Sequence, residues 1–583
     1  MNRVKAQTCC NLSNISPNVK HHCNGLNLDY TACGPSVCLT NIKETTVKSQ
    51  RKQAAQRRRR IIFNNDGNET AWAASATSEA VQRVNVTGLV GSNVDTMFYC
   101  TNHGFNNNSH NTKVSEMAYV TGAGVPDDPT QANIFKALID QGTDPLKIMC
   151  EFSRRHDIEM FWSFRINDEH AAWVPDMRTQ YVKDHPDHLL GTPEAPPPRG
   201  PWCGVDYAVP AVRDQAFAMI EEVCHEYDVD GVELDYFRQL TCFKKQAWGE
   251  PLDQADCDMM TDLLRRVRAM MDQVGAKKGR PLLLAVRVPD SVEFAQALGL
   301  DLMTWLGDEL IDIMVPGGYF WLNPWKVSVK LGHDHGVPVY PSLDGSRLGA
   351  FEPEAGEIRR GDDAYRAHAA DAFHAGADGI YVFNFNYFRD PAHLIWRQLG
   401  DPQVLAEQDK LYHVSVMGHG QPPIEHYLPG GEQYMNLPTL CPDRPVELSP
   451  GQSHSTTLRV VDDVNAWKRR PHGPYVHLYV LAEHIEDAGD LTVQLNASTL
   501  ESRAMTWHGK SDGKWRQHGR KYIVEPHVVK QGINDLVISV SAGARACTIH
   551  DVQLAIDYEL NGTRRRSLAQ SRGRYVAHHQ ATV

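Results

Sequence analysis

The chain has 583 residues, 42% of them hydrophobic and 22% charged, which is enough for two or more globular domains. No stretch approaches the roughly 20 consecutive apolar residues that span a bilayer, so we expect no membrane partner. The net charge of −12 is uneven: residues 1–60 carry a surplus of +9, five arginines follow residue 560, and −26 remains for residues 61–560. An acidic body repels nucleic-acid backbones, so we expect no nucleic-acid partner.

Both basic ends of the chain are predicted to be disordered. Residues 1–60 contain no apolar run and therefore no recognisable secretory signal, and residues 561–583 resemble them in composition. The 13 cysteines follow no trusted metal-ligand spacing, so we expect neither a metal nor another cofactor. The sequence leaves the cell compartment and the oligomeric state open.

From residue 61 onward, short β-rich apolar runs alternate with segments of helical period, as in a parallel sheet covered by helices. Helical spacing is clear at 210–226, 256–274 and 362–375. Eight units predict a (β/α)8 TIM barrel over residues 61–400. The alternative is a doubly wound sheet, but no glycine-rich phosphate loop follows the first run. The eight predicted strands are 61–63, 95–99, 158–164, 231–237, 282–288, 311–315, 337–343 and 379–385.

After residue 400 the helical period fades and alternation of apolar and polar residues replaces it. Such alternation is typical of half-buried antiparallel strands. We therefore predict an extension at 401–445 and an antiparallel β-sandwich at 446–560, acting as a capping or carbohydrate-binding domain. The predicted strands of the sandwich include Tyr475–Leu481, Leu491–Leu495, Leu536–Val540 and Val552–Tyr558.

In a TIM barrel, the loops at the C-terminal ends of the strands build the active site. Polar side chains gather at those ends, and aromatic side chains near them could stack on the apolar faces of sugars. The arginines and histidines could instead bind acidic sugars or pair with the barrel's own acids. The predicted substrate-binding residues are Asn65, Asp66, Asn102, His103, Arg165, Asn167, His170, Trp173, Arg238, Arg287, Tyr319, Trp321, Asn384 and Asn386.

The fourth predicted strand carries two acids, Glu233 and Asp235. Because alternate side chains of a strand share a face, both are expected to point into the barrel. Close carboxylates have displaced pKa values, so one can act as an acid and the other as a base or nucleophile. The structural alternative is an ion-pair network of these acids with Arg165 and Arg287.

Glycoside hydrolysis needs two carboxyl groups on opposite faces of the scissile bond. Side chains two residues apart on one strand seldom straddle a sugar, so the opposing group is expected from another strand end. Asp168, Asp290 and Asp344 are the candidates, and the sequence does not choose among them. We therefore predict a glycoside hydrolase acting on a poly- or oligosaccharide.

The segment Tyr227–Arg238, with its Asp-Gly pair followed by Glu233, Asp235 and Arg238, resembles the fourth strand of the bacterial glycosyl-hydrolase-like (family-10-like) barrel proteins. The resemblance extends to Phe164–Asp168 and to Val212-Arg213-Asp214, and it implies a sugar-hydrolysing TIM barrel over about residues 61–400. The same strand is similar to the chitinase motif Asp-Gly-x-Asp-x-Asp-x-Glu. It has Phe237 in place of the final acid, which argues against chitinase-type chemistry.

Other enzyme classes lack their usual motifs in this sequence. No His-x-His pair ends the first strand, and no Gly-x-Ser-x-Gly elbow is present, which argues against a metal-dependent hydrolase and a serine esterase. Two alternatives remain. One is a non-catalytic carbohydrate-binding scaffold with an inactive barrel, and the other is a polysaccharide lyase or another sugar-active barrel enzyme.

Overall fold

The computed structural model describes residues 48–126, 132–344, 361–383, 393–415, 424–467, 474–485, 487–503 and 518–558. The basic tail at 561–583, most of the N-terminal basic segment and the predicted site residues Asn384 and Asn386 lie outside these ranges. In the described part, no helix has both the length and the hydrophobicity needed to cross a membrane.

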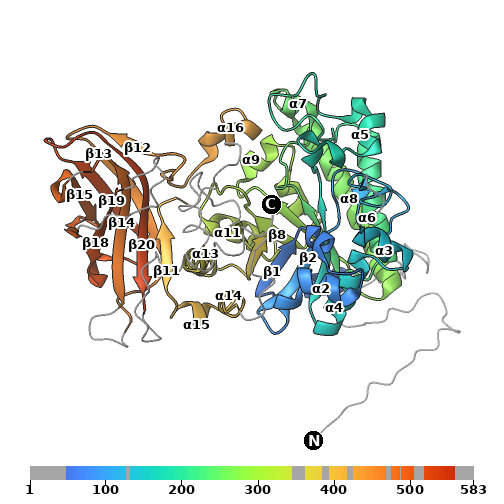
Figure 1. The fold of residues 1–583 in the computed structure, drawn as a ribbon, viewed down its shortest axis with the longest axis horizontal. Helices are drawn as coiled ribbons and strands as arrows, with labels where there is room; N and C mark the ends of the chain where they lie inside the picture. Colours follow the sequence, from blue (N-terminus) through green and yellow to red (C-terminus); the bar gives the residue numbers. More distant parts are fainter. Residues whose placement is uncertain are drawn as a thin grey trace, which may run out of the picture. The chain divides into compact units, whose positions relative to one another are not determined.

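Eight parallel strands form one sheet, in the spatial order β8-β7-β6-β5-β2-β1-β10-β9. Helices lie around the strands of this sheet (Figure 1). A parallel bridge between Met314 of β8 and Val339, just before β9, brings the two edges together, so the sheet is nearly closed into a barrel. The predicted (β/α)8 architecture is thus confirmed. The strands are β1 (Ile61–Asn65), β2 (Val94–Cys100), β5 (Glu159–Arg165), β6 (Gly231–Asp235), β7 (Leu283–Val288), β8 (Ile313–Pro316), β9 (Ser342–Leu343) and β10 (Ile380–Phe383).

Helices follow the strands and bury their apolar faces on the outside of the sheet. The longest, α8, begins at a capping box in which Asp253 and Asp256 exchange hydrogen bonds, and it ends where Gly279 takes a left-handed conformation. The helices of this region are α2 (Ser78–Asn85), α3 (Ile134–Asp140), α4 (Pro145–His156), α5 (Gln180–Asp184), α6 (Pro210–Glu226), α7 (Lys244–Ala247), α8 (Gln254–Lys278), α9 (Val292–Ala297), α10 (Leu302–Gly307), α11 (Trp325–Asp334), α13 (Asp362–His374) and α14 (Ile395–Gln398).

The strands divide their side chains between two apolar clusters. Ile61 and Phe63 of β1 pack outward against the helices, whereas Ile62 packs inward with Phe98 and Phe161. This is the two-residue alternation of a strand buried on both faces. It follows that the side chains of Asn64, Glu233 and Asp235, in phase with the inward residues, belong to the barrel interior.

A buried ion pair lies at the N-terminal end of the barrel. Arg59 contacts Glu159 of β5 through Nε (2.6 Å) and Nη2 (2.9 Å), and Thr96 donates a further hydrogen bond of 2.9 Å to the same carboxylate. Residues 51–55 are helical, and the Arg59 side chain is fully buried. This part of the predicted disordered segment 1–60 is therefore ordered, because Arg59 compensates an acid at the barrel floor.

The C-terminal part of the chain forms antiparallel sheets of six and four strands. All four predicted strands are present, but β11 lies within the predicted extension 401–445 and pairs with β20, so that segment belongs in part to the sheets. One apolar cluster contains residues of both sheets. The strands are β11 (Lys410–His413), β12 (Val446–Leu448), β13 (Ser453–Val460), β14 (Tyr475–Glu483), β15 (Leu491–Leu495), β16 (Ser498–Thr499), β17 (Glu501–Arg503), β18 (His518–Val524), β19 (Gly532–Val540) and β20 (Cys547–Asp557).

Replacing Glu159 by Gln should strongly destabilise the barrel, because the Arg59 charge would remain buried without its partner. We expect the free energy of unfolding in urea to fall by about 3–5 kcal/mol. The control is Asp140→Asn, which removes a surface ion pair with Lys136. The side chain of Asp140 is 61% exposed and that of Lys136 is 56% exposed. That change should cost no more than about 1 kcal/mol. Equal losses in the two variants would contradict the structural role of the buried pair.

Candidate active site

Charged side chains of alternating sign line the C-terminal end of the barrel. Arg165, which ends β5, pairs with Asp66, and Arg287 of β7 pairs with Asp235 (3.3 Å) and with Asp344 (2.9 Å). Strand register produces this pattern, since Asp235 lies opposite Arg165 on one side and Arg287 on the other. The predicted ion-pair network of Glu233 and Asp235 with Arg165 and Arg287 is therefore present only as the pair Asp235–Arg287. The two arginines bind three further predicted acids, Asp66, Asp168 and Asp344.

Asp235 is fixed at the end of β6 by two different donors. Besides the Arg287 guanidinium, the backbone N–H of Arg238 donates a hydrogen bond of 3.0 Å to its Oδ1. The residue is only 1% exposed. These contacts fix the direction in which the carboxylate points, because they engage both of its oxygens.

Glu233 lies one layer deeper and differs from Asp235 in its environment. It is fully buried, and its Oε2 accepts hydrogen bonds from Asn64 (2.9 Å) and Ser163 (2.5 Å). Within the described chain it makes no ion pair. Burial and the charge of Asp235 raise the pKa of Glu233 from 4.5 to about 8, although the Ser163 hydrogen bond and the Arg287 charge oppose this. Burial and the neighbouring charge therefore favour the protonated form of Glu233.

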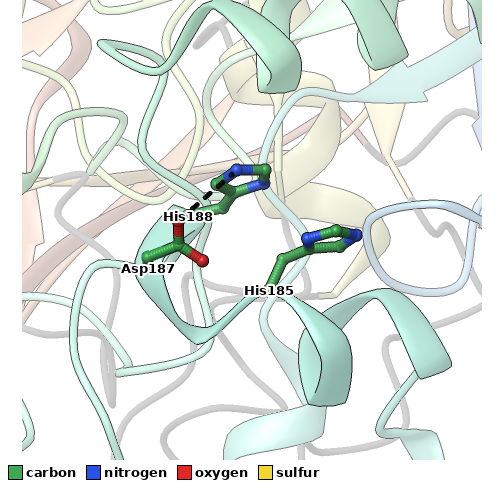
Figure 2. Close-up of side chains that lie close together, drawn as sticks. All are labelled: His185, Asp187 and His188. Carbon is green, nitrogen blue, oxygen red and sulfur yellow. Dashed lines mark ion pairs between the residues drawn. The ribbon is translucent and has the colours of Figure 1, made fainter.

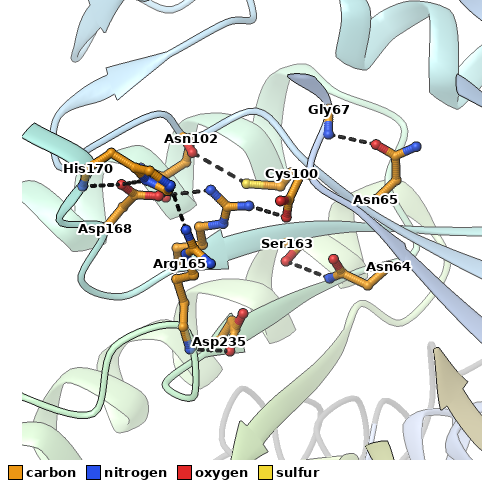
Figure 3. A network of polar contacts seen from close by, with 12 residues as sticks. Asn64, Asn65, Gly67, Cys100, Asn102, Ser163, Arg165, Asp168, His170 and Asp235 are labelled. Atoms are coloured by element: carbon orange, nitrogen blue, oxygen red, sulfur yellow. Dashed lines mark hydrogen bonds and ion pairs between the residues drawn. The ribbon is translucent and has the colours of Figure 1, made fainter. Parts of the chain in front are cut away.

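A chain of polar contacts leads from the barrel to its rim (Figure 3). Asp168 accepts from Arg165 (2.8 Å) and from Nδ1 of His170 (2.7 Å), and Arg238 contacts Nε2 of His170 (2.6 Å) and the hydroxyl of Tyr319 (3.0 Å). An arginine only donates, so Nε2 of His170 must accept and Nδ1 must carry the hydrogen. Burial acts to raise the pKa of Asp168, but the hydrogen bond from His170 and the charges of Arg165 and Arg238 hold it well below its ordinary value.

A cavity of about 500 Å³ opens beside this chain of contacts. Of the predicted residues, His170, Trp173, Arg238 and Tyr319 line it, and Trp173 is 61% exposed. Trp202, one of the aromatic residues expected near the strand ends, lines it too, but sequence reasoning missed the other lining residues. Glu169 could have been found from its position between two predicted residues, whereas the loop residues Gln239 and Tyr427 carry no comparable signal.

The first strand shows how the alternation rule selects one of two neighbouring asparagines. Asn65, which was predicted, faces outward: its amide donates to the carbonyl of Asn85 (3.3 Å) and its Oδ1 accepts from the backbone N–H of Gly67 (2.6 Å). Asn64, which was not predicted, faces inward and contacts Glu233. The same alternation that placed Glu233 would have identified Asn64.

Several predicted residues hold loops in place. Both oxygens of Asp290 accept backbone N–H groups of the loop after β8, and burial raises its pKa to about 6 despite these bonds. Trp321 packs against Trp325, with ring centroids 4.2 Å apart, and does not line the cavity. The remaining contacts are Asn102 Nδ2 to the carbonyl of Gly104 (2.8 Å), His103 Nε2 with Ser109 Oγ (3.1 Å), and Asn167 Nδ2 to the carbonyls of Val205 (3.0 Å) and Thr241 (2.9 Å).

His185, Asp187 and His188 form the one metal-type cluster found among the described residues (Figure 2). Their spacing, His-x-Asp-His, was not predicted from the sequence as a metal site. Their potential ligand atoms lie within 4.8 Å of one another, and Nδ1 of His188 contacts the hydroxyl of Tyr181 at 2.9 Å. The two imidazole planes are nearly parallel, at 7°, so their lone pairs cannot converge on one ion unless a ring turns. None of the three residues lines the cavity.

Residues 127–258 match the family described as "Glycosyl hydrolase-like 10", which confirms the resemblance seen in the sequence. The matched segment contains β5, β6 and the loop between them. A comparison with curated protein sequences gave no significant match.

Solved structures of several glycoside hydrolases are similar to the chain at low identity. An α-L-fucosidase from Paenibacillus thiaminolyticus is 14% identical with a TM-score of 0.37, and the match covers 60% of this chain and 49% of that one. A family 18 N-acetylglucosaminidase from Paenibacillus barengoltzii is 14% identical with a TM-score of 0.32, and the match covers 59% of this chain and 99% of that one. The PgaB glycoside hydrolase domain from Bordetella bronchiseptica is 10% identical with a TM-score of 0.37, and the match covers 59% of this chain and 99% of that one. The chain spans about half the length of the fucosidase.

Glu233→Gln should change how the stability of the protein depends on pH. A carboxyl group whose pKa is raised on folding stabilises the native state below pH 4.5, and this contribution is lost as the pH rises towards about 8. The wild-type free energy of unfolding should therefore fall more steeply over this interval than that of the variant, by at least about 1 kcal/mol. Urea titrations across the interval measure the difference. The exposed substitution Glu151→Gln should leave the profile unchanged, and parallel profiles for wild type and Glu233→Gln would contradict the assignment.

Proposed function

We propose that the protein is a glycoside hydrolase whose active site lies at the C-terminal end of the barrel around Asp235. The observation that carries the proposal is the pair Glu233–Asp235 on β6. Two neighbouring acids lie in different layers, and the deeper one is protonated while the outer one is paired with Arg287. The outer acid is at the end of the strand, where TIM barrels carry out their chemistry. The match to a glycosyl-hydrolase-like family supports a sugar-active barrel.

In this proposal Asp235 attacks the anomeric carbon or activates the attacking water. Its orientation is set by Arg287 and by the backbone N–H of Arg238, as a nucleophile or base requires. Glu233 is a positioning residue in this proposal, because in its neutral form it lies below Asp235 without adding a second negative charge.

The three acids considered as opposing groups differ in what their contacts allow. Asp344 shares Arg287 with Asp235, and Asp290 is engaged by backbone N–H groups. Asp168 is held deprotonated by Arg165 and His170, which does not suit a proton donor. These contacts favour structural or electrostatic roles for all three.

The wall of the cavity supports a carbohydrate as the substrate. Trp173, Trp202 and Tyr319 line it together with the cationic group of Arg238. Aromatic faces suit the apolar C–H faces of sugars, and the arginine can donate hydrogen bonds to hydroxyl or acidic groups.

The C-terminal sheets are proposed to form the β-sandwich domain expected from the sequence. The single apolar cluster with members from both sheets supports this arrangement. With β11 included, the domain would begin near residue 410 rather than 446, following the barrel domain and its short C-terminal extension.

Asp235→Asn tests the function directly. Purified wild-type protein is incubated with a panel of plant, algal and microbial polysaccharides, and released oligosaccharides are measured by mass spectrometry. On any substrate that is cleaved, the variant should lose about 10²–10⁴-fold in kcat while its affinity for the glycan changes little. Asp140→Asn, at an exposed site, is the matched control and should behave as wild type.

Two outcomes would favour other functions. Products that carry a 4,5-unsaturated sugar, detected by ultraviolet absorbance, would indicate a lyase. Binding without turnover by the wild-type protein across the panel would favour a carbohydrate-binding scaffold.

A further inference from the structure

Arg238 is a cationic side chain on the wall of the cavity, in the loop directly after β6. Its guanidinium is held by two neutral groups, the hydroxyl of Tyr319 (3.0 Å from Nη1) and Nε2 of His170 (2.6 Å from Nη2). It makes no ion pair with an acid in the described part of the chain, whereas Arg165 and Arg287 each contact two carboxylates. The charge of Arg238 is therefore positioned by its contacts but not neutralised by them.

The contacts of Arg238 leave donors for a ligand. A guanidinium carries five N–H groups, and Tyr319 and His170 engage two of them, so three make no hydrogen bond to a described residue. The Nε of Arg238 is one of these donors, and it is not shielded from solvent, unlike the buried Nε of Arg287. Carboxylate and sulfate oxygens are the acceptors that a guanidinium binds most strongly. The side chain is thus suited to an anion that enters the cavity.

The acid that lines the cavity among the described residues, Glu169, does not offset this charge. Both of its carboxyl oxygens are buried, so neither is presented to a ligand. Burial and the charge of Asp168 raise the pKa of Glu169 well above its ordinary value, which favours the neutral form. The wall that a ligand would meet therefore carries a positive charge.

The acids nearest to Arg238 lie behind this wall. Asp66 and Asp168 both contact Arg165, and none of these three side chains lines the cavity. Asp168 is separated from Arg238 by the ring of His170, which contacts Asp168 through Nδ1 and Arg238 through Nε2. An anion in the cavity would therefore contact the arginine and neither of these acids.

Two further arginines lie next to lining residues, and neither makes an ion pair within the described ranges. The guanidinium carbon of Arg178 lies 5.1 Å from the centroid of the Trp202 ring. Arg199 directly precedes Gly200, its Nε is buried without a hydrogen-bond partner, and burial together with its charge lowers the pKa of His426. Trp202, Gly200 and His426 all line the cavity. On a body that is acidic overall, this grouping of arginines attracts anions locally.

We propose that this cavity binds an anionic sugar unit of the glycan substrate, with Arg238 on its carboxylate or sulfate group and Trp173 or Trp202 on its apolar face. The choice of a saccharide as the ligand rests on the proposed hydrolase function. Asp235 does not line the cavity, so the site is a binding subsite and need not hold the bond that is cleaved. Arg238 is then a specificity-determining residue that selects acidic polysaccharides.

The test measures the binding of oligosaccharides that differ only in charge, by isothermal titration calorimetry on the full chain. Uronate oligosaccharides from pectin and alginate are compared with the same compounds after reduction of their carboxyl groups to alcohols, and sulfated oligosaccharides with their desulfated forms. We expect the anionic member of at least one pair to bind about 10–100-fold more tightly than its neutral counterpart. The pair that shows this preference distinguishes a carboxylate from a sulfate.

Arg238→Gln removes the charge at the cavity and should remove the preference. Its affinity for the anionic oligosaccharide should fall about 10–100-fold, and that for the neutral counterpart should change less than about 3-fold. The matched control is Arg155→Gln, the same change in charge at an exposed residue of the last turn of α4, which precedes β5 and so lies at the opposite end of the barrel. This control should leave both affinities unchanged.

Two measurements decide the question even if Arg238→Gln fails to fold, which its thermal unfolding would reveal. In the wild type, added salt should weaken the binding of the anionic member and leave that of the neutral member unchanged, because screening acts only on the charge. Trp173→Ala, at a lining residue that is 61% exposed, should weaken both members by the same factor. An unchanged affinity in this variant would place the ligand outside the cavity and contradict the proposal.

The outcomes separate the two proposals. If no anionic oligosaccharide binds more tightly than its neutral counterpart, or if Arg238→Gln weakens both members alike, the cavity does not select anionic sugars. The hydrolase function then still stands if the wild type cleaves a neutral glycan. If the wild type shows the charge-dependent binding but cleaves no glycan, the hydrolase function fails and the anionic subsite remains.

Discussion

The constraint on which this structure depends is that charges inside a closed barrel must be compensated within the barrel. At the C-terminal end of the strands, Arg287 bridges Asp235 and Asp344, and Arg165 bridges Asp66 and Asp168. At the opposite end, Arg59 compensates Glu159 in the same way. Because an unpaired ion in a low-dielectric interior costs several kcal/mol, each of these pairs fixes both its members and the strands that carry them. The polar site is therefore also part of what holds the barrel in one arrangement.

The same constraint explains why the two acids of β6, Glu233 and Asp235, differ in how readily they hold a proton. Glu233 lies one layer below the arginines and is surrounded by Asn64 and Ser163, which are neutral, so it keeps its proton. Asp235 lies level with Arg287 and is paired with it. A displacement of two residues along β6, about 7 Å, thus separates a neutral carboxyl group from a charged one.

The sequence by itself determined the parallel barrel and led to the proposed location of the site. Period-two and helical patterns are local properties, so seven of the eight strands and the three helices predicted from them agree with those observed to within a few residues. The seventh strand, predicted at 337–343, is shortened to Ser342–Leu343. Alternation on β6 put Glu233 and Asp235 inside, and strand ends put Arg165, Arg238 and His170 near them. The local pattern misled where a contact far along the chain decides the outcome. Arg59 was assigned to a disordered segment although Glu159, one hundred residues later, orders it.

Only the tertiary structure decided what each acid can do. Asp168, Asp290 and Asp344 are equivalent as strand-end acids in the sequence, but their partners are an arginine with a histidine, backbone N–H groups, and an arginine shared with Asp235, respectively. Which of these partners each acid meets leaves no trace in a sequence. The physical reason is that proton affinity depends on desolvation and on charges within a few ångströms, and those neighbours come from strands and loops that are distant along the chain.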